Sequence, residues 1–493
     1  MEPKNQKYAD DRFSNLPDEI VHHILFFLRR MKDLARLSVV SKRCKELCIS
    51  NPNLFLSNMN DKSVGSHFNS FVDRFMALRC LYGVRTERFQ LRWSFFDQDE
   101  GNRVETWLQH AVNLGGVAVI RLKFIHPHPA KRFALLLCVL RCNSLRFLEV
   151  DAGNAFLTLP STLSTDPYFA TKLQFLHLAS IKIEKDCNFG ELISSFKSLK
   201  VLMLNEIRRV KSMTITSSSI EILFIRSIGC LLCDIDIQQT DKLYNLQLIW
   251  FTRSSTSNSL KISAPNLQKF GWSGFVVDYY CMRDSPHLLH AVIGLHLPAQ
   301  PRGNQASTKD TLVKLLHSLR KARHLKLLDC FAEALLKQGC LPFSFDNVEH
   351  LTVDRTSSGD QVLPLSSLLR GTPNLKLLNL HVHPSVINST PSSSRDLPFK
   401  MEYWQSQNFM FTHQLKTVAV QLFDRENEIE LIKYLLKNAE KLEEMVVLYT
   451  SQVSSHVISE LRKYKKPSTK VFLRSKSYNK LGRVCAIRGR RLV

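Results

Sequence analysis

The feature of this sequence most similar to half of a metal site is a C-x-x-C pair, in which two residues separate Cys230 from Cys233. A structural zinc ion takes four ligands, and no second pair follows at zinc-ribbon spacing. The other cysteines are scattered, many of them inside apolar runs, and the chain opens without a secretory signal. We therefore expect reduced cysteines packed as small apolar side chains, and no metal.

Two further patterns could do chemistry but fail in detail. The stretch 97–101 resembles the start of a calcium loop, yet its glycine comes one place early and Leu108 stands where a bidentate glutamate is needed. The stretch 271–274 is not a nucleophile elbow, because the serine lacks the required glycine spacing. Since no catalytic constellation is visible, we expect a non-catalytic protein that needs no cofactor.

The N-terminal region, 11–57, predicts three short helices. Pro17 suits the first helical position, where its missing N–H would be unpaired in any case. Asp33 is expected to cap the second helix and Ser41 the third, and 51–53 (Asn-Pro-Asn) ends the module. A module this small cannot bury many apolar side chains by itself. Its apolar positions therefore either face a partner or pack only among themselves.

The order of residues in this module resembles the F-box. The matching segments are Leu16-Pro17-Asp18-Glu19-Ile20, then Ile24 and Leu28, then 37–43 (Leu-Ser-Val-Val-Ser-Lys-Arg). In that family the apolar positions bind the Skp-family linker of cullin-based ubiquitin ligases. Carried over to this chain, the resemblance implies that the linker-binding residues are Leu16, Pro17, Ile20, Ile24, Leu28 and Val40. Cys44 and Cys48 stand where similar plant proteins often have tryptophan.

From Val117 onward the pattern L-x-x-L-x-L recurs, with other apolar residues replacing leucine. Successive copies from 117 to 267 start 28, 28, 26, 21, 23 and 24 residues apart, near the ~20–29 of leucine-rich repeats. The two apolar residues of each L-x-L point inward and the residue between them points outward, because a strand alternates its faces. One repeat cannot bury its own apolar face, so many copies must stack into a solenoid.

The outward residues should form a row on the concave face of this solenoid. Further members are Gly271, Thr352 and Asn379, and the candidates for binding a target protein are Arg121, Glu149, His177, Met203, Phe224 and Gln247. An exposed Phe224 beside Met203 favours binding, since large exposed apolar groups often mark interfaces. The alternative is that the row is only a solvated strand surface.

The C-terminal region, 401–473, resembles the FBD domain of plant F-box/leucine-rich proteins. The resemblance rests on Glu430-Leu-Ile-Lys-Tyr-Leu-Leu-Lys-Asn-Ala439, followed by Leu442-Glu-Glu-Met445. Locally the sequence predicts a strand at 415–420, a helix at 426–441 and a strand at 442–447, which is a parallel strand–helix–strand unit. This unit should close the solenoid as one more repeat.

The formal net charge of +23 is unevenly placed. The stretch 461–493 holds twelve basic residues and no acidic one. It therefore contributes over half of the net positive charge of the chain. A solvated tail is one interpretation, and a nuclear-import signal or a nucleic-acid contact is another. The longest apolar run, 133–140, is far shorter than the ~18–20 residues of a membrane span, and we expect no membrane association.

These observations predict an α/β fold in which a three-helix F-box precedes a leucine-rich-repeat solenoid with parallel strands on its concave face. The expected organisation is a disordered N-terminus at 1–10, an F-box at 11–57, a linker and N-terminal cap at 58–110, leucine-rich repeats at 111–400, an FBD-like cap at 401–473 and a basic tail at 474–493.

The function that the resemblance implies is that of a substrate-recognition adaptor of an SCF-type (cullin-RING) ubiquitin ligase. Its partners would be a Skp-family linker, through it a cullin, and an unidentified target protein. The alternative is a non-catalytic nuclear scaffold or RNA-associated protein that uses the basic tail. The absence of a secretory signal, together with the tail, favours the nucleus, the cytoplasm or both.

Overall fold

The computed structural model forms two compact units, Met1–Leu232 and Cys233–Val493. It describes residues 13, 15–28, 31–59, 66–94, 100–125, 132–134, 137–154, 156–158, 171–183, 189–252, 257–297, 305–328, 344–355, 362–382, 400–422, 426–449, 455–464 and 469–475. The N-terminus at 1–10 and the basic residues from 476 onward lie outside these ranges.

Three helices open the first unit, as the sequence predicts: α1 (Asp18–Phe26), α2 (Met31–Ser38) and α3 (Lys42–Ser50). The Ser41 cap is confirmed, because its side chain accepts a hydrogen bond from the Cys44 N–H. Two details of the prediction are wrong. Pro17 is the N-cap of α1 and not its first helical residue, and Asp33 lies within the first turn of α2, where its charge still suits the helix dipole.

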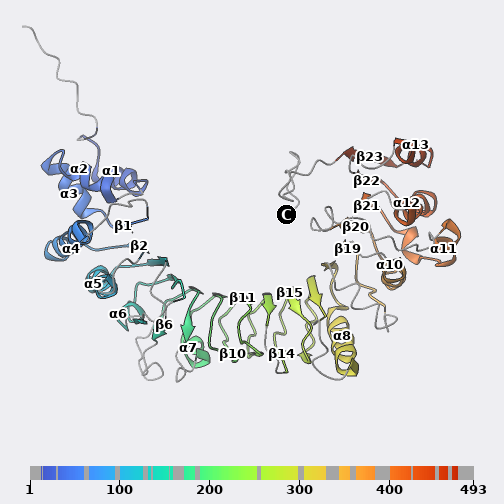
Figure 1. Cartoon of the computed structure of the whole chain (residues 1–493), viewed down its shortest axis with the longest axis horizontal. Coiled ribbons are helices and arrows are strands. Elements are labelled where there is room, and N and C mark those ends of the chain that lie inside the picture. The colour runs from blue at the N-terminus through green and yellow to red at the C-terminus, as the bar shows by residue number, and fades with distance from the viewer. Residues whose placement is uncertain are drawn as a thin grey trace, which may run out of the picture. The chain divides into compact units, whose positions relative to one another are not determined.

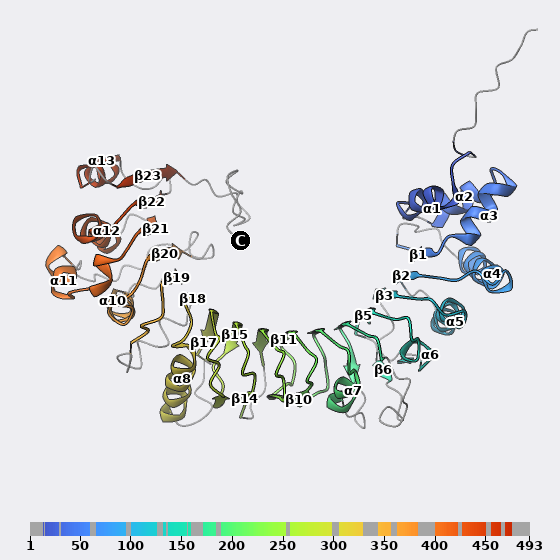
Figure 2. The same cartoon turned by 180° about the vertical axis from the view of Figure 1, so that it is seen from behind.

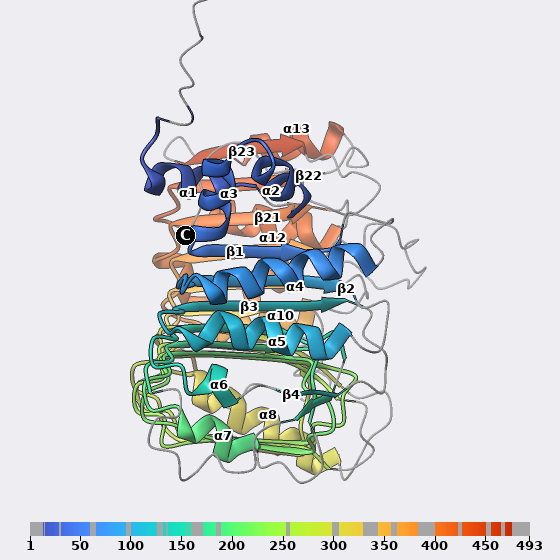
Figure 3. The same ribbon diagram turned by 90° about the vertical axis from the view of Figure 1, so that its left-hand side faces the viewer.

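A parallel sheet follows in the first unit, with strands in chain order along the sheet (Figure 1). Its strands are β1 (Asn53–Ser57), β2 (Arg88–Ser94), β3 (Val119–Ile125), β5 (Phe147–Asp151), β7 (Phe175–Ala179), β9 (Val201–Asn205) and β11 (Ile222–Ile228). Helices α4 (Ser66–Leu81), α5 (Glu100–Asn113), α6 (Leu137–Leu140) and α7 (Phe189–Ser195) lie on one side of this sheet (Figure 3). We call the other side the open face.

Short strands make a second layer on the helix side of the first unit. They are β4 (Arg132–Ala134), β6 (Phe156–Thr158) and β8 (Lys182–Ile183), which pair with one another, and β10 (Ser212–Thr216), which packs against α7. Each of them follows a main strand along the chain. Every repeat of this region therefore runs across the open face, turns, and returns along the opposite side.

The second unit repeats the same plan (Figure 2). Its main strands are β13 (Asn245–Phe251), β15 (Lys269–Phe275), β17 (His290–His296), β18 (His324–Leu327), β19 (His350–Arg355), β20 (Leu377–Val382), β21 (Thr417–Leu422), β22 (Glu444–Tyr449) and β23 (Lys470–Ser475). Shorter strands pair behind them: β12 (Asp234–Gln238), β14 (Ser259–Ile262) and β16 (Tyr279–Met282). The helical segments are α8 (Gln305–Leu319), α10 (Val362–Arg370), α11 (Met401–Ser406), η3 (Met410–His413), α12 (Glu426–Asn438) and α13 (Ser455–Lys463).

The apolar repeat positions build the core, as predicted. Each main strand from β3 to β15 begins two residues after the start of a pattern copy, so that Val117 precedes β3 and Leu145 precedes β5. The inward residues of β3, Ile120 and Leu122, are at most 1% exposed, and the same alternation recurs in the following strands. The fold-class prediction of parallel repeat strands is therefore confirmed.

Smaller differences from the sequence prediction have local causes. The helix expected at 426–441 ends at Asn438, and its predicted apolar side is buried. Cys230 and Cys233 are both buried, as expected of core cysteines. Gly271 faces outward as predicted but is buried, because the side chain of its register neighbour Gln247 lies over it, with Oε1 2.0 Å from where a Cβ would stand.

Candidate protein-binding surfaces

The three N-terminal helices leave large apolar side chains in solvent. Val21 and Leu25 form the buried side of α1, whereas Ile20 and Ile24 remain 49% and 39% exposed. Val40, in the turn after α2, is 72% exposed. We call Ile20, Ile24, Phe27, Val39 and Val40 the exposed apolar set. Packing among the apolar residues of the module therefore does not bury these five side chains.

The other predicted linker contacts are placed differently. Pro17 is exposed at the start of α1, and Leu16 and Leu28 are partly buried. Leu16 also anchors the module through its backbone, since its carbonyl accepts a hydrogen bond of 3.0 Å from the Arg43 guanidinium. The same Arg43 donates to Asp18 Oδ1 at 2.9 Å and so ties α3 to the start of α1. These two hydrogen bonds of Arg43 therefore hold α3 against the start of α1.

Cys44 and Cys48 point into the core of this module. Both thiols are buried, and the Cys48 Sγ lies 3.7 Å from the Leu34 carbonyl. Burial, with a smaller contribution from Cys44, raises the pKa of Cys48 to about 11, so this thiol stays neutral. The cysteines that replace tryptophan in similar proteins therefore pack the inside of the module and leave its exposed apolar set unchanged.

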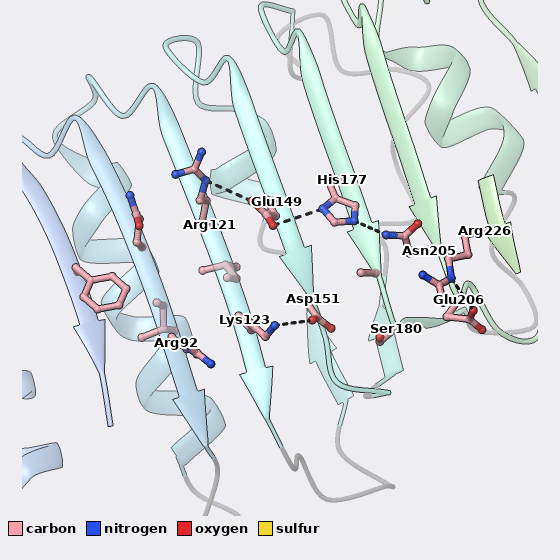
Figure 4. Close-up of a pocket in the computed structure, with 15 residues that line it drawn as sticks. Arg92, Arg121, Lys123, Glu149, Asp151, His177, Ser180, Asn205, Glu206 and Arg226 are labelled. Carbon is pink, nitrogen blue, oxygen red and sulfur yellow. Dashed lines mark hydrogen bonds and ion pairs between the residues drawn. The ribbon is translucent and has the colours of Figure 1, made fainter. Parts of the chain in front are cut away.

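A pocket with a volume of about 430 Å³ lies on the open face of the first unit (Figure 4). Three of the predicted target-binding residues, Arg121, Glu149 and His177, line it as neighbours on β3, β5 and β7. Met203 and Phe224 continue this row on β9 and β11 but do not line the pocket. Phe224 is half-buried rather than exposed as expected.

The predicted row forms a connected polar network. Arg121 Nε lies 3.3 Å from one carboxylate oxygen of Glu149, and His177 Nδ1 lies 3.5 Å from the other. The Asn205 amide donates to His177 Nε2 at 2.9 Å, so the imidazole proton must sit on Nδ1, facing Glu149. The Arg121 guanidinium also stacks over the Phe147 ring at 4.7 Å. These contacts fix the side chains in place before any ligand arrives.

A second row, two residues further along each strand, was not predicted. In register across β2 to β11 it consists of Arg92, Lys123, Asp151, Ala179, Asn205 and Arg226. Lys123 Nζ lies 3.7 Å from Asp151 Oδ2, and Arg226 Nε lies 4.0 Å from Glu206 Oε1. The strand alternation that located the first row also predicts this one, because every second residue of a strand shares its face.

The remaining predicted positions lie in the second unit. Gln247 on β13 pairs in register with Gly271 on β15, and Thr352 on β19 pairs in register with Asn379 on β20. Among the residues that the structure describes, no group of histidine, cysteine or carboxylate side chains could hold a metal ion. None of the described helices is both long and apolar enough to cross a membrane.

Three family models match parts of the chain. The F-box-like model matches residues 13–55, the model for the LRR repeats of FBD-associated F-box protein At5g56370 matches 104–278, and the FBD model matches 410–447. The first match covers the three helices, the second runs from within α5 to the end of β15, and the third runs from η3 into β22.

Curated relatives from Arabidopsis thaliana match nearly the whole chain. Putative F-box/FBD/LRR-repeat protein At4g03220 is 24% identical over 89% of this chain and 89% of its own length. F-box/LRR-repeat protein At3g59250 is 26% identical over 92% of this chain and 93% of its own length. The chain therefore carries an F-box-like domain, LRR repeats and an FBD domain in that order, and it is similar along nearly its whole length to plant F-box/LRR-repeat proteins.

Proposed function

We propose that the chain is the substrate-recognition adaptor of an SCF-type ubiquitin ligase. Its F-box holds a Skp-family linker, the linker joins it to a cullin, and the repeats hold a target protein. Proteins with this pair of domains generally serve as such adaptors and carry no catalytic site. The mechanism is proximity, because holding a target beside the ubiquitin-loaded subunits raises the effective concentration of its lysines.

The observation that carries this proposal is the exposed apolar set of the F-box. The five side chains of this set and Phe26 make six large apolar side chains that are exposed within a module of about forty residues, among them Phe27 at 64% and Val39 at 83%. Transfer of such side chains from water into an interface stabilises a complex by ~25 cal/mol per Å² of apolar area. A helical partner that covers Ile20 and Ile24, one turn apart on α1, would gain this energy.

A linker-binding experiment tests the proposal. The full chain is co-expressed with a tagged Skp-family linker, and the captured amount is compared with that of an Ile24→Ser, Val40→Ser double variant. Both residues are exposed, so the variant should fold normally. Removing two anchors of an interface should cost ~2 kcal/mol or more, and we expect at least about a tenfold loss of captured protein.

The matched control is a Leu81→Ser, Tyr82→Ser variant. These side chains, at the end of α4 and just beyond it, are 79% and 66% exposed but lie outside the three helices. We expect this variant to bind as the wild type does. Two results would contradict the proposal. One is that the Ile24→Ser, Val40→Ser variant captures as much linker as the wild type does, and the other is that a folded wild-type chain captures none.

The basic stretch 461–493 supports a second candidate function, a contact with RNA or a nuclear-import signal. If the tail binds RNA, affinity should fall steeply as salt rises and vanish in a truncated chain that lacks residues 461–493. If the tail is an import signal, a fluorescent fusion of the full chain should be nuclear and the truncated one cytoplasmic. A truncated chain that keeps both the RNA affinity and the distribution of the full chain would rule out both roles.

A further inference from the structure

Apolar side chains form a continuous row across the open face of the first unit. Each of the consecutive main strands from β3 to β11 begins with an outward apolar residue, and these residues pair in register from strand to strand. We call this row the apolar stripe, and its members, all partly exposed, are Val119, Phe147, Phe175, Val201 and Ile222. A contiguous apolar surface of this kind is typical of a protein-binding site.

The stripe runs beside the predicted target-binding row, two residues nearer the start of each strand. Met203 and Phe224, both partly exposed, widen it on β9 and β11. On β2 the same register position is held by Arg88, which is exposed and charged, so the stripe ends at β3. The apolar surface therefore extends over five adjacent strands of the first unit.

The two aromatic rings of the stripe have little free face. Phe147 and Phe175 are stacked, with ring centroids 4.1 Å apart and 3° between the ring planes. The Arg121 guanidinium lies over Phe147 at 4.7 Å, and because Arg121 and Phe175 come from strands on opposite sides of β5, they cover opposite faces of that ring. Nucleic-acid bases stack on free aromatic faces, so this pair favours the apolar side chains of a protein over RNA.

Unpaired positive charges follow one side of the stripe. Arg146, Lys172 and Lys197 lie in the segments that lead into β5, β7 and β9, each within four residues of a member of the stripe, and all three are exposed. None of them forms an ion pair with a carboxylate of the described residues, whereas the Nζ of their neighbour Lys200 lies 3.1 Å from Glu221 Oε1. Acidic groups of a partner would therefore meet uncompensated cations on this side.

The spacing of the stripe matches one side of an α-helix. Neighbouring strands lie ~4.8 Å apart, whereas successive turns of a helix bring apolar residues to the same side every ~5.4 Å and an extended chain does so every ~6.6 Å. The backbone groups of β5, β7 and β9 also pair with strands on both sides, so they are not available to an extended peptide. The path from β3 to β11 is ~19 Å, which about 13 helical residues span.

We propose that the apolar stripe binds an amphipathic helix of the target protein, which lies across the strands. The apolar side of this helix, about 13 residues long, packs on the stripe, and acidic residues along one flank lie beside Arg146, Lys172 and Lys197. The inference rests on the proposed function in assigning the helix to a target, whereas the stripe and its cations are properties of the repeats alone.

A synthetic peptide tests this inference. The probe is a fluorescein-labelled helical peptide of about 14 residues, with leucines at i, i+3, i+4 and i+7 spacing and glutamates along one flank, and its binding to the full chain is followed by anisotropy. We expect Phe175→Ser to weaken binding by about tenfold, because it removes an aromatic anchor from the middle of the stripe. A peptide of the same composition with scrambled leucines should bind at least about tenfold more weakly.

A charge exchange tests the same surface without altering the stripe, so it does not depend on the folding of the Phe175 variant. Arg146→Glu, Lys172→Glu reverses two exposed charges. We expect this variant to bind the glutamate peptide about tenfold more weakly than the wild type does, and to bind a peptide with lysines in place of the glutamates more tightly. The matched control is Arg208→Glu, Lys211→Glu, which changes the net charge equally at two exposed positions beyond the other end of β9. It should change either affinity by less than about twofold.

Four outcomes would overturn the inference. They are no binding of the glutamate peptide, equal binding of the scrambled peptide, an equal loss of affinity in the two charge variants, and displacement of the peptide by a short single-stranded RNA that binds more tightly through Arg146 and Lys172. Linker capture is measured on the same preparations. If the peptide binds through the stripe while the linker is not captured, the stripe assignment stands and the adaptor proposal fails; the reverse result retains the adaptor and rejects the stripe as a helix site.

Discussion

At the scale of single residues, Arg79 joins the F-box to the repeats. Its side chain is 2% exposed and donates to the carbonyls of Ile49 and Asn51, the latter at 2.7 Å, and to Thr86 Oγ1 at 3.1 Å. Those carbonyls end α3, where a positive charge suits the helix dipole. Burial lowers the pKa of Arg79 to about 10, so the guanidinium is still charged at neutral pH.

Replacing Arg79 should therefore destabilise the junction. An Arg79→Met variant leaves at least two buried carbonyls without donors, and we expect the free energy of unfolding to fall by ~3 kcal/mol. Arg79→Lys should recover only part of this loss, because one ammonium cannot reach all the acceptors. Urea denaturation of the full chain measures both. Wild-type stability in Arg79→Met would contradict the role assigned to this residue.

Sequence reasoning succeeds at residue scale where the cause is local. Ser41 could be recognised as a cap because it interacts with the third residue after it. Arg79 could not be recognised, since its acceptors at Ile49 and Asn51 are about thirty residues earlier in the chain. Arg92 and Asn205 were missed for a different reason. Asn205 lies at the end of β9, beyond the first outward residue that the L-x-L pattern marks. Arg92 lies on β2, which the repeat pattern does not locate.

At the scale of elements, three adjacent strands of the second unit begin with histidines whose rings contact one another, the first pair stacked and the second edge to face. The rings of His290 and His324 have centroids 4.3 Å apart, and those of His324 and His350 are 4.2 Å apart. Burial lowers the pKa of all three. Neighbouring histidines and the cations Lys269, Arg323 and Lys376 lower these pKa values further, whereas Glu349 acts in the opposite direction on His324 and His350.

This histidine row predicts a pH-dependent stability. Because the folded-state pKa values lie below the ordinary 6.5, the unfolded chain binds protons more readily. The thermal midpoint should therefore fall as pH drops from 7.5 to 5.5, and His324→Gln should reduce this fall. The control is His296→Gln, at the other end of β17. If both variants show the same pH profile as the wild type, the row does not control the titration.

Element positions were predictable wherever the repeat pattern is regular. The spacing located the main strands from β3 to β15, and the strand–helix–strand pattern located β21 and β22, because apolar periodicity directly reflects burial. It did not locate β1 and β2, which form the sheet edge within the stretches assigned to the F-box and to the linker and cap. These strands lack the leading apolar residues of a repeat copy. α4 packs beside β2, where the Phe68 ring stacks on Trp93.

At the scale of the whole molecule, the chain combines two surfaces of different chemistry. The F-box exposes apolar side chains, whereas the open face of the first unit presents paired charges and hydrogen-bonding groups. Apolar anchors give affinity to a constant partner, and charge patterns give specificity among alternatives. This division of chemistry is what an adaptor requires, because one partner is shared and the other must be selected.

Assembly with purified partners tests the central claim most directly. The full chain, a Skp-family linker and a cullin are mixed, and the mass of the complex is measured by light scattering after gel filtration. The account predicts a complex containing one copy of each, from which the Ile24→Ser, Val40→Ser chain is absent. If linker and cullin assemble while the folded wild-type chain elutes alone, the chain is not an SCF adaptor.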